Sequence, residues 1–185
     1  MVKIALTGQM RSGKDTVARR LVERYDFVKL AFADDMKRIF HELCPHIPKY
    51  PKPRAEYQRF GEEIRSLYGA DIWVRHVERR VERLTDYFKA HGQTLKIVIT
   101  DLRLPIEYDW CKRNGFVIVR VIADENIRRE RAAFSGDKVS AADWSHETEN
   151  YSKDFEIDYE IVNDGSLAEL ERQVDELMTK MEANN

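Results

Sequence analysis

Short runs of apolar residues recur along the chain and predict five β-strands. The runs cover Val2–Thr7, 27–32, 95–100, 116–123 and Tyr159–Val162. The first, third and fourth runs are almost continuously apolar, which is typical of strands buried on both faces of a parallel sheet. We therefore expect these three strands near the centre of the sheet.

Apolar residues at helical spacing fill much of the sequence between the strands. Four series lie within residues 17–25, 57–68, 73–88 and 167–181, and Ser166 is the expected N-cap of the last helix. Strands that alternate with helices predict an α/β fold. We expect a five-stranded parallel sheet with helices on both faces.

The chain of 185 residues predicts one domain, residues 1–185. Two connections are too long for a plain crossover helix: residues 33–94 and residues 124–157. Both leave the carboxyl ends of strands, the edge at which open α/β sheets bind ligands. We therefore expect both insertions to carry function.

Charge and cysteine usage narrow the classes of protein. The chain has 31 basic and 33 acidic side chains, which argues against binding a nucleic-acid polymer. Cys44 and Cys111 show no framework spacing and predict free thiols in a reducing compartment. No apolar run approaches the roughly 18 residues of a membrane span. We expect a cytoplasmic protein without a membrane partner. The sequence is compatible with a homodimer but does not predict one.

A glycine-rich segment follows the first strand and opens the first helix. It contains Gly8, Arg11, Ser12, Gly13, Lys14, Asp15 and Thr16. This context is that of a P-loop, whose backbone N–H groups and lysine bind phosphate oxygens. We expect these residues to bind ATP, and we expect Lys14 to stabilise the negative charge of the phosphoryl group during its transfer. A glycine-rich turn without a ligand is the alternative.

Magnesium is the expected metal. Asp15 stands where the common P-loop pattern has Ser or Thr, and Thr16 places a hydroxyl one residue later. Asp101 ends the third strand, where a carboxylate can hold the ion or its water. We expect Asp15, Thr16 and Asp101 at the metal, although a turn or N-cap role for Asp101 is the alternative.

Arginines in the insertions suit phosphoryl transfer, which depends on positioning and positive charge. Arg54, Gln58, Gly61 and Arg65 form one polar stripe on a predicted helix. Glycine in a helix interior costs about 1 kcal/mol relative to alanine. Close approach of a ligand or of another backbone segment would explain why glycine stands at position 61. A solvated helix flank is the alternative.

Three further arginines lie near the expected active edge. Arg103 suits a bidentate phosphate contact, with a structural pairing to Glu107 as the alternative. Arg128 and Arg131 predict a lid over the ATP phosphates, with ordinary surface pairing as the alternative. His41, Cys44 and His46 lack a second ligand pair, so we expect no metal site there.

These motifs resemble the deoxynucleoside monophosphate kinases, a branch of the P-loop nucleoside monophosphate kinases. The matching segments are residues 11–16, 32–37, 58–65, 100–103 with Glu107, and 163–166. The resemblance implies an acceptor-binding insertion, a lid, ATP as donor and magnesium. It also implies that the acceptor contacts Asp34, Lys37, Gln58, Arg65 and Arg103. Residues 144–149 are a looser variant of the family's segment between lid and last strand.

We therefore expect an ATP-dependent kinase whose acceptor is a (deoxy)nucleoside monophosphate. Similar small P-loop kinases phosphorylate phosphomevalonate, dephospho-coenzyme A or sugar acids, so another acceptor is the first alternative. A nucleotide-dependent switch without catalysis is the second. The chain has no Asn-Lys-x-Asp sequence for reading guanine, which weighs against a GTPase.

Overall fold

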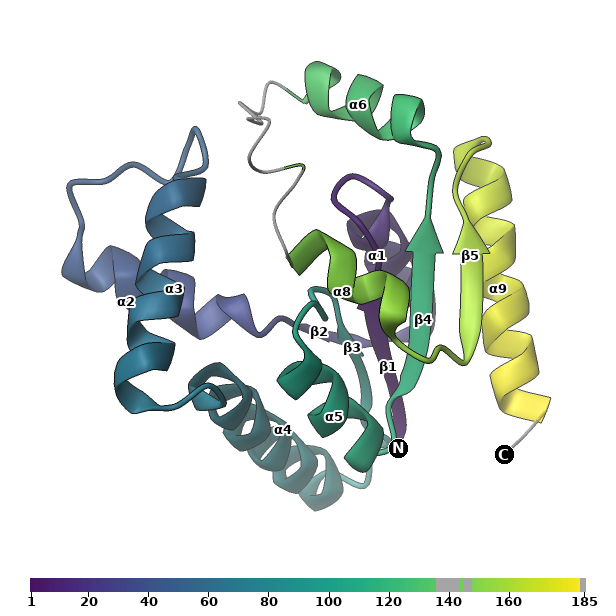
Figure 1. Ribbon diagram of the computed structural model, residues 1–185. Helices are drawn as coiled ribbons and strands as arrows, with labels where there is room; N and C mark the ends of the chain where they lie inside the picture. Colours follow the sequence, from purple (N-terminus) through teal and green to yellow (C-terminus); the bar gives the residue numbers. More distant parts are fainter. Residues whose placement is uncertain (136–143, 145–147, 184–185) are drawn as a thin grey trace.

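Five parallel strands form one sheet, in agreement with the sequence prediction. The computed structural model describes residues 1–135, 144 and 148–183. The strand order is β2-β3-β1-β4-β5 (Figure 1). The bounds are β1 (Val2–Thr7), β2 (Val28–Leu30), β3 (Lys96–Ile99), β4 (Val117–Ile122) and β5 (Tyr159–Val162). The three most apolar runs form the centre of the sheet, because β1 pairs with β3 on one side and β4 on the other.

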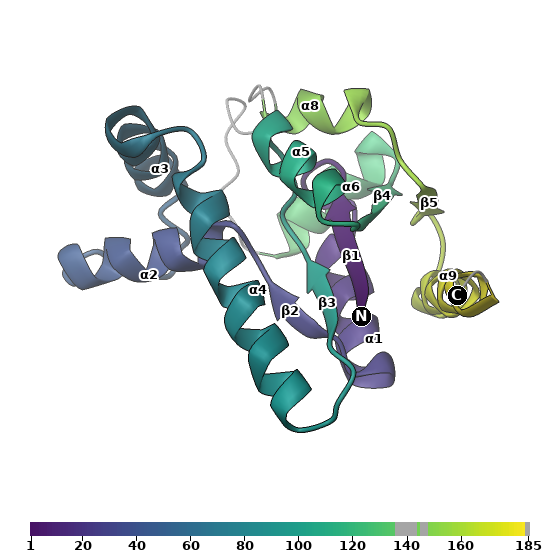
Figure 2. The same cartoon turned by 90° about the horizontal axis from the view of Figure 1, so that it is seen from below.

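Helices cover both faces of the sheet, as predicted (Figures 1 and 2). Within the described part of the chain they are α1 (Lys14–Tyr25), α2 (Ala33–Leu43), α3 (Arg54–Tyr68), α4 (Ile72–Ala90), α5 (Pro105–Arg113), α6 (Glu125–Phe134), α8 (Thr148–Asp154) and α9 (Leu167–Ala183). The capping prediction for α9 is confirmed, because Ser166 Oγ accepts the backbone N–H of Glu169. The Glu169 carboxylate in turn accepts the backbone N–H of Ser166, which completes a capping box.

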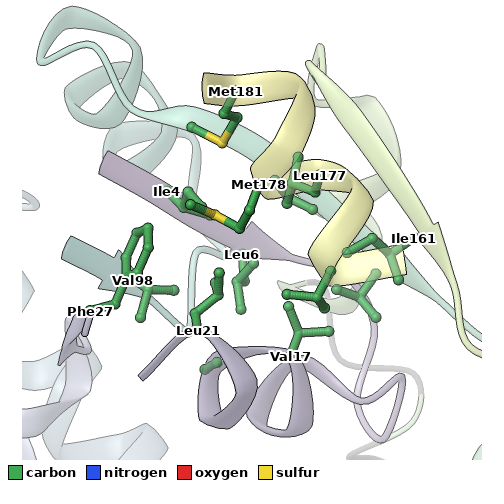
Figure 3. Close-up of a cluster of buried hydrophobic side chains, with 14 of the residues drawn as sticks. Ile4, Leu6, Val17, Leu21, Phe27, Val98, Ile161, Leu177, Met178 and Met181 are labelled. Atoms are coloured by element: carbon green, nitrogen blue, oxygen red, sulfur yellow. The ribbon is translucent and has the colours of Figure 1, made fainter. Parts of the chain in front are cut away.

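Alternation along β1 divides its side chains between two hydrophobic cores. Ile4 and Leu6 point to one face, where Leu21 of α1 and Met178 of α9 pack against them (Figure 3). Ala5 points to the other face, which α4 and α5 cover. Burying one such leucine contributes about 1.5–3 kcal/mol. A strand with cores on both sides needs consecutive apolar residues, and β1 has them at Ile4, Ala5 and Leu6.

The first insertion, residues 33–94, folds into α2, α3 and α4. Its own small core contains Met36, Phe40, Tyr57 and Trp73. Helices α2 and α3 stand clear of the sheet, whereas α4 packs along it (Figures 1 and 2). Leu67 and Tyr68, the last apolar residues of α3, are exposed, so the predicted apolar face is buried only over the first part of that helix.

Candidate active site

Backbone strain shapes the loop between β1 and α1. Gly8, Arg11 and Gly13 all have positive φ angles, of 133°, 64° and 108°. A Cβ atom at Gly13 would lie 2.1 Å from Nδ2 of Asn163, and one at Gly8 would lie 2.1 Å from the carbonyl oxygen of Val121. Only glycine fits these two positions, because both have positive φ and pack closely against other backbone or side-chain atoms of the protein.

Lys14 is the first residue of α1, and its side chain contacts this loop. Its Nζ donates hydrogen bonds to the carbonyl oxygens of Gly8, at 2.6 Å, and Gln9, at 2.8 Å. The side chain is buried. The ammonium group is therefore held at the wall of the loop, at the start of α1, where the helix N-terminus adds partial positive charge.

A cavity of about 520 Å³ opens in front of the loop. Five of the predicted ATP-binding residues line it: Arg11, Gly13, Lys14, Asp15 and Thr16. Gly8 and Ser12 do not. They line a smaller cavity of about 160 Å³, together with residues of β4 and α8. We call the larger space the phosphate cavity.

Three side chains, two from α6 and one from the residue after β5, hold the loop in place. Asn163 Nδ2 donates to the carbonyl oxygen of Ser12 at 2.8 Å. Arg131 Nη2 donates to the carbonyl oxygen of Asn163 at 2.9 Å. Arg128 is buried, and its guanidinium donates to the carbonyl oxygens of Ala123 and Met10. The loop is thus braced from β5 and α6.

This arrangement separates the two arginines that were predicted to form a lid. Arg131 lines the phosphate cavity, so its contact with ATP stays a prediction. Arg128 lies behind the loop, with its Cζ 5.5 Å from the centre of the Trp144 ring. The surface pairing expected for this helix is made by Arg129, which binds Glu125 at 2.7 Å. Residues 145–147 of the looser motif lie outside the described residues.

A second cavity, of about 230 Å³, lies between α2, α3 and the loop after β3. Lys37, Gln58, Arg65 and Arg103, all predicted to bind the acceptor, line it. Its apolar wall consists of Phe32, Met36, Tyr57 and Trp73. We call it the acceptor cavity. Asp34 lines the phosphate cavity instead, and its carboxylate pairs with Arg80 at 3.3 Å.

The two cavities share one wall, formed by Lys37, Lys52, Arg54, Asp101 and Arg103. Four of these five side chains are cationic. Lys52 and Arg54 are absent from the predicted site. Lys52 lies in the proline-rich loop between α2 and α3 (residues 45–53), where no periodicity marks it, and Arg54 is predicted only as part of the polar stripe. Anions placed in either cavity would meet the same positive charges.

Asp101 has the structural role that the sequence offered as the alternative, and its role at magnesium stays a prediction. Its two carboxylate oxygens accept the backbone N–H groups of Phe32, at 2.8 Å, and Ala33, at 3.0 Å, and so fix the start of α2. Burial raises the pKa of Asp101, while these hydrogen bonds and the charges of Lys37 and Arg103 oppose that rise. Asp101 also lines both cavities.

The residues around the phosphate cavity fit magnesium. The Thr16 hydroxyl and the Asp101 carboxylate are oxygen ligands, which this ion prefers. Asp15 is exposed and pairs with Lys29 at 3.0 Å. Within the described residues no three His, Cys, Asp or Glu side chains form a metal cluster. An ion here would therefore complete its ligands with water and nucleotide phosphates.

Glu107 supports the loop that carries Arg103. Its Oε2 atom accepts the backbone N–H groups of Arg103 and Leu104, each at 2.9 Å. Burial, and next the nearby charge of Asp101, raise the pKa of Glu107 to about 8. Glu107 therefore pairs with the backbone of Arg103, and Arg103 also lines the shared wall.

Comparison with known proteins gives the class of fold. No protein-family model matches the chain. Dephospho-CoA kinase of Clostridium perfringens is 26% identical over 96% of both chains. The structure of a dephospho-CoA kinase from Campylobacter jejuni has a TM-score of 0.58 at 13% identity, covering 99% of this chain and 98% of the other. Shikimate kinase from Acinetobacter baumannii has a TM-score of 0.56 at 13% identity, covering 100% and 95%.

The chain therefore has the fold of the P-loop kinases, as the sequence predicts. The similarity to the Clostridium perfringens kinase over almost the whole chain also supports phosphotransferase activity. These proteins are named for dephospho-CoA and shikimate, so the comparisons do not single out the deoxynucleoside monophosphate kinases that the motifs resemble. No helix in the described part of the chain is long and apolar enough to cross a membrane.

Proposed function

We propose that this protein is a kinase that transfers the γ-phosphoryl group of ATP to a small phosphorylated acceptor. The observation that carries the proposal is the pair of cavities separated by one cationic wall. Phosphoryl transfer requires donor and acceptor to meet in line, with positive charge around the group in transit. Two adjoining anion sites provide that arrangement.

The donor side has the parts that phosphate binding needs. Backbone N–H groups of the loop and the Lys14 ammonium would hold the β- and γ-phosphates of ATP. Magnesium, held by Thr16 and Asp101, would neutralise developing charge. Arg103 and Lys37 border both cavities and would contact the transferring group from the acceptor side.

Two acceptors are favoured by different observations. Dephospho-CoA is favoured by the relative that matches almost the whole chain. A (deoxy)nucleoside monophosphate is favoured by the motifs and by the acceptor cavity, where Lys37, Arg65 and Arg103 surround a space with one aromatic wall. Both molecules combine a nucleoside with phosphate, so cations beside Tyr57 and Trp73 suit either. We place dephospho-CoA first because the comparisons favour it.

An acceptor panel tests the proposal. Purified protein with ATP and magnesium is mixed with dephospho-CoA, each common nucleoside or deoxynucleoside monophosphate, phosphomevalonate or gluconate, and ADP release is recorded. We expect release that depends on one class of phosphorylated acceptor and that disappears in Lys14→Ala. ATP binding without release for any acceptor would instead support a non-catalytic nucleotide-binding protein.

A further inference from the structure

Gly61 stands at a position where glycine lowers the stability of the helix. It lies in the interior of α3 and is buried. Glycine in a helix interior is less favourable than alanine because it loses more backbone entropy on folding. A glycine retained at such a site usually serves a left-handed backbone, a tight packing contact or the close approach of another molecule.

The protein itself does not require glycine at this position. Gly61 is not among the residues with positive φ, so its backbone suits any residue. A Cβ atom added there would lie 3.7 Å from Nη1 of Arg65, 3.9 Å from Cγ of Met36 and 4.0 Å from Nε1 of Trp73. These are ordinary van der Waals distances. Alanine would fit without strain, so the first two explanations fail.

The added atom would point into the acceptor cavity. Arg65, Met36 and Trp73, its three nearest neighbours, all line that cavity, and so does Gly61. The indole N–H of Trp73 donates to the carbonyl oxygen of Gly61 at 3.3 Å, which holds this turn of α3 against α4. The backbone at Gly61 is thus a fixed part of the cavity wall, beside a cationic side chain.

We propose that Gly61 determines acceptor specificity: the bound acceptor lies against its Cα atom, and a side chain there would exclude it. The inference rests on the proposed function, since it assigns the cavity to the acceptor. Met36 and Trp73 flank this space and Arg65 Nη1 lies nearest to it, so the part of the acceptor next to Gly61 would combine a flat or apolar group with a group that accepts a hydrogen bond from Arg65.

Gly61→Ala tests the proposal, with Ser66→Ala as the matched control. Ser66 lies on the same helix, is exposed and lines neither cavity. Both changes raise helix propensity, so both variants should melt at or above the wild-type temperature. One additional methyl group in a fitted pocket should lower acceptor kcat/KM about ten- to two-hundredfold in Gly61→Ala. The KM for ATP and all constants of Ser66→Ala should stay unchanged.

Two readouts keep this inference separate from the proposed function. Acceptor-dependent ADP release by the wild type tests the function, and calorimetric binding of dephospho-CoA or dAMP to wild type and variant tests Gly61 directly. Unchanged acceptor affinity and turnover in a stable Gly61→Ala variant would overturn the specificity role. A lower melting temperature would also overturn it, since glycine would then serve packing. Neither release nor binding in the wild type would overturn both.

Discussion

Arg65 and Arg103 should contribute differently to catalysis, because Arg103 lies in the wall that the two cavities share and Arg65 does not. Arg65 lines only the acceptor cavity, whereas Arg103 also lines the phosphate cavity. Charge-assisted hydrogen bonds contribute about 1.5–3 kcal/mol. Arg65→Ala should therefore lower acceptor kcat/KM about ten- to a hundredfold, through KM rather than kcat. Arg103→Ala should lower kcat as well, since its guanidinium would face the group in transit.

Steady-state kinetics that vary ATP and acceptor separately would measure these effects. Lysine at position 65 should restore little, because a point charge cannot replace the planar guanidinium fork. Arg59→Ala is the matched control: it removes an equal charge from an exposed position of α3 that lines neither cavity. If Arg59→Ala matched Arg65→Ala, the effect would be general electrostatics. If Arg65→Ala changed only the KM for ATP, the acceptor assignment would be wrong.

Three further substitutions test the phosphate side and the loop after β3. Lys14→Ala should abolish ADP release with unchanged far-UV circular dichroism, because the ammonium that contacts the loop carbonyls would also stabilise the phosphate charge during transfer. Near-wild-type release would contradict the phosphate-binding loop. Asp101→Asn should raise the magnesium concentration at which the rate is half-maximal, and a magnesium titration of the rate measures this. It should also lower the free energy of unfolding by about 1–3 kcal/mol in urea, because the amide nitrogen cannot accept the backbone N–H of Phe32 or Ala33. An unchanged magnesium titration would limit Asp101 to a structural role. Glu107 has a folded-state pKa raised to about 8, so between its ordinary value and pH 8 the folded protein binds more protons than the unfolded chain. The free energy of unfolding should therefore fall as pH rises through this window, by up to about 1.4 kcal/mol per unit. Glu107→Gln, whose single carbonyl oxygen can accept both backbone N–H groups, should remove that slope in urea titrations at pH 5, 6.5 and 8, and an unchanged slope would refute the assignment.

The sheet was predictable because its signals are local. Continuous apolar runs marked β1, β3 and β4, and a glycine-rich turn with Lys14 marked the loop that follows β1. The bounds of β1 and β5 agree with the prediction, whereas β2, β3 and β4 were predicted one or two residues too long at their ends. At β2 the cause is Asp101, which takes the backbone N–H of Phe32 and turns the chain into α2.

The site was less predictable, because it depends on contacts between distant segments. The spacing of Arg128 and Arg131 placed them near one another on a helix but could not tell which would face the phosphate cavity. Lys52 belongs to the shared wall through the path of a proline-rich loop, which no periodicity describes. The raised pKa of Glu107 likewise follows from burial beside Asp101.

The small core under the acceptor cavity has an evolutionary consequence. Met36, Phe40 and Tyr57 pack with Trp73 in a cluster distinct from the two cores of the sheet. Helix α4 joins the two regions, with Trp73 in the small cluster and Val77 in a sheet core. Mutations on α2 and α3 can therefore remodel one substrate pocket while the nucleotide-binding scaffold keeps its stability. Such a division would confine changes of the acceptor cavity to α2, α3 and the start of α4.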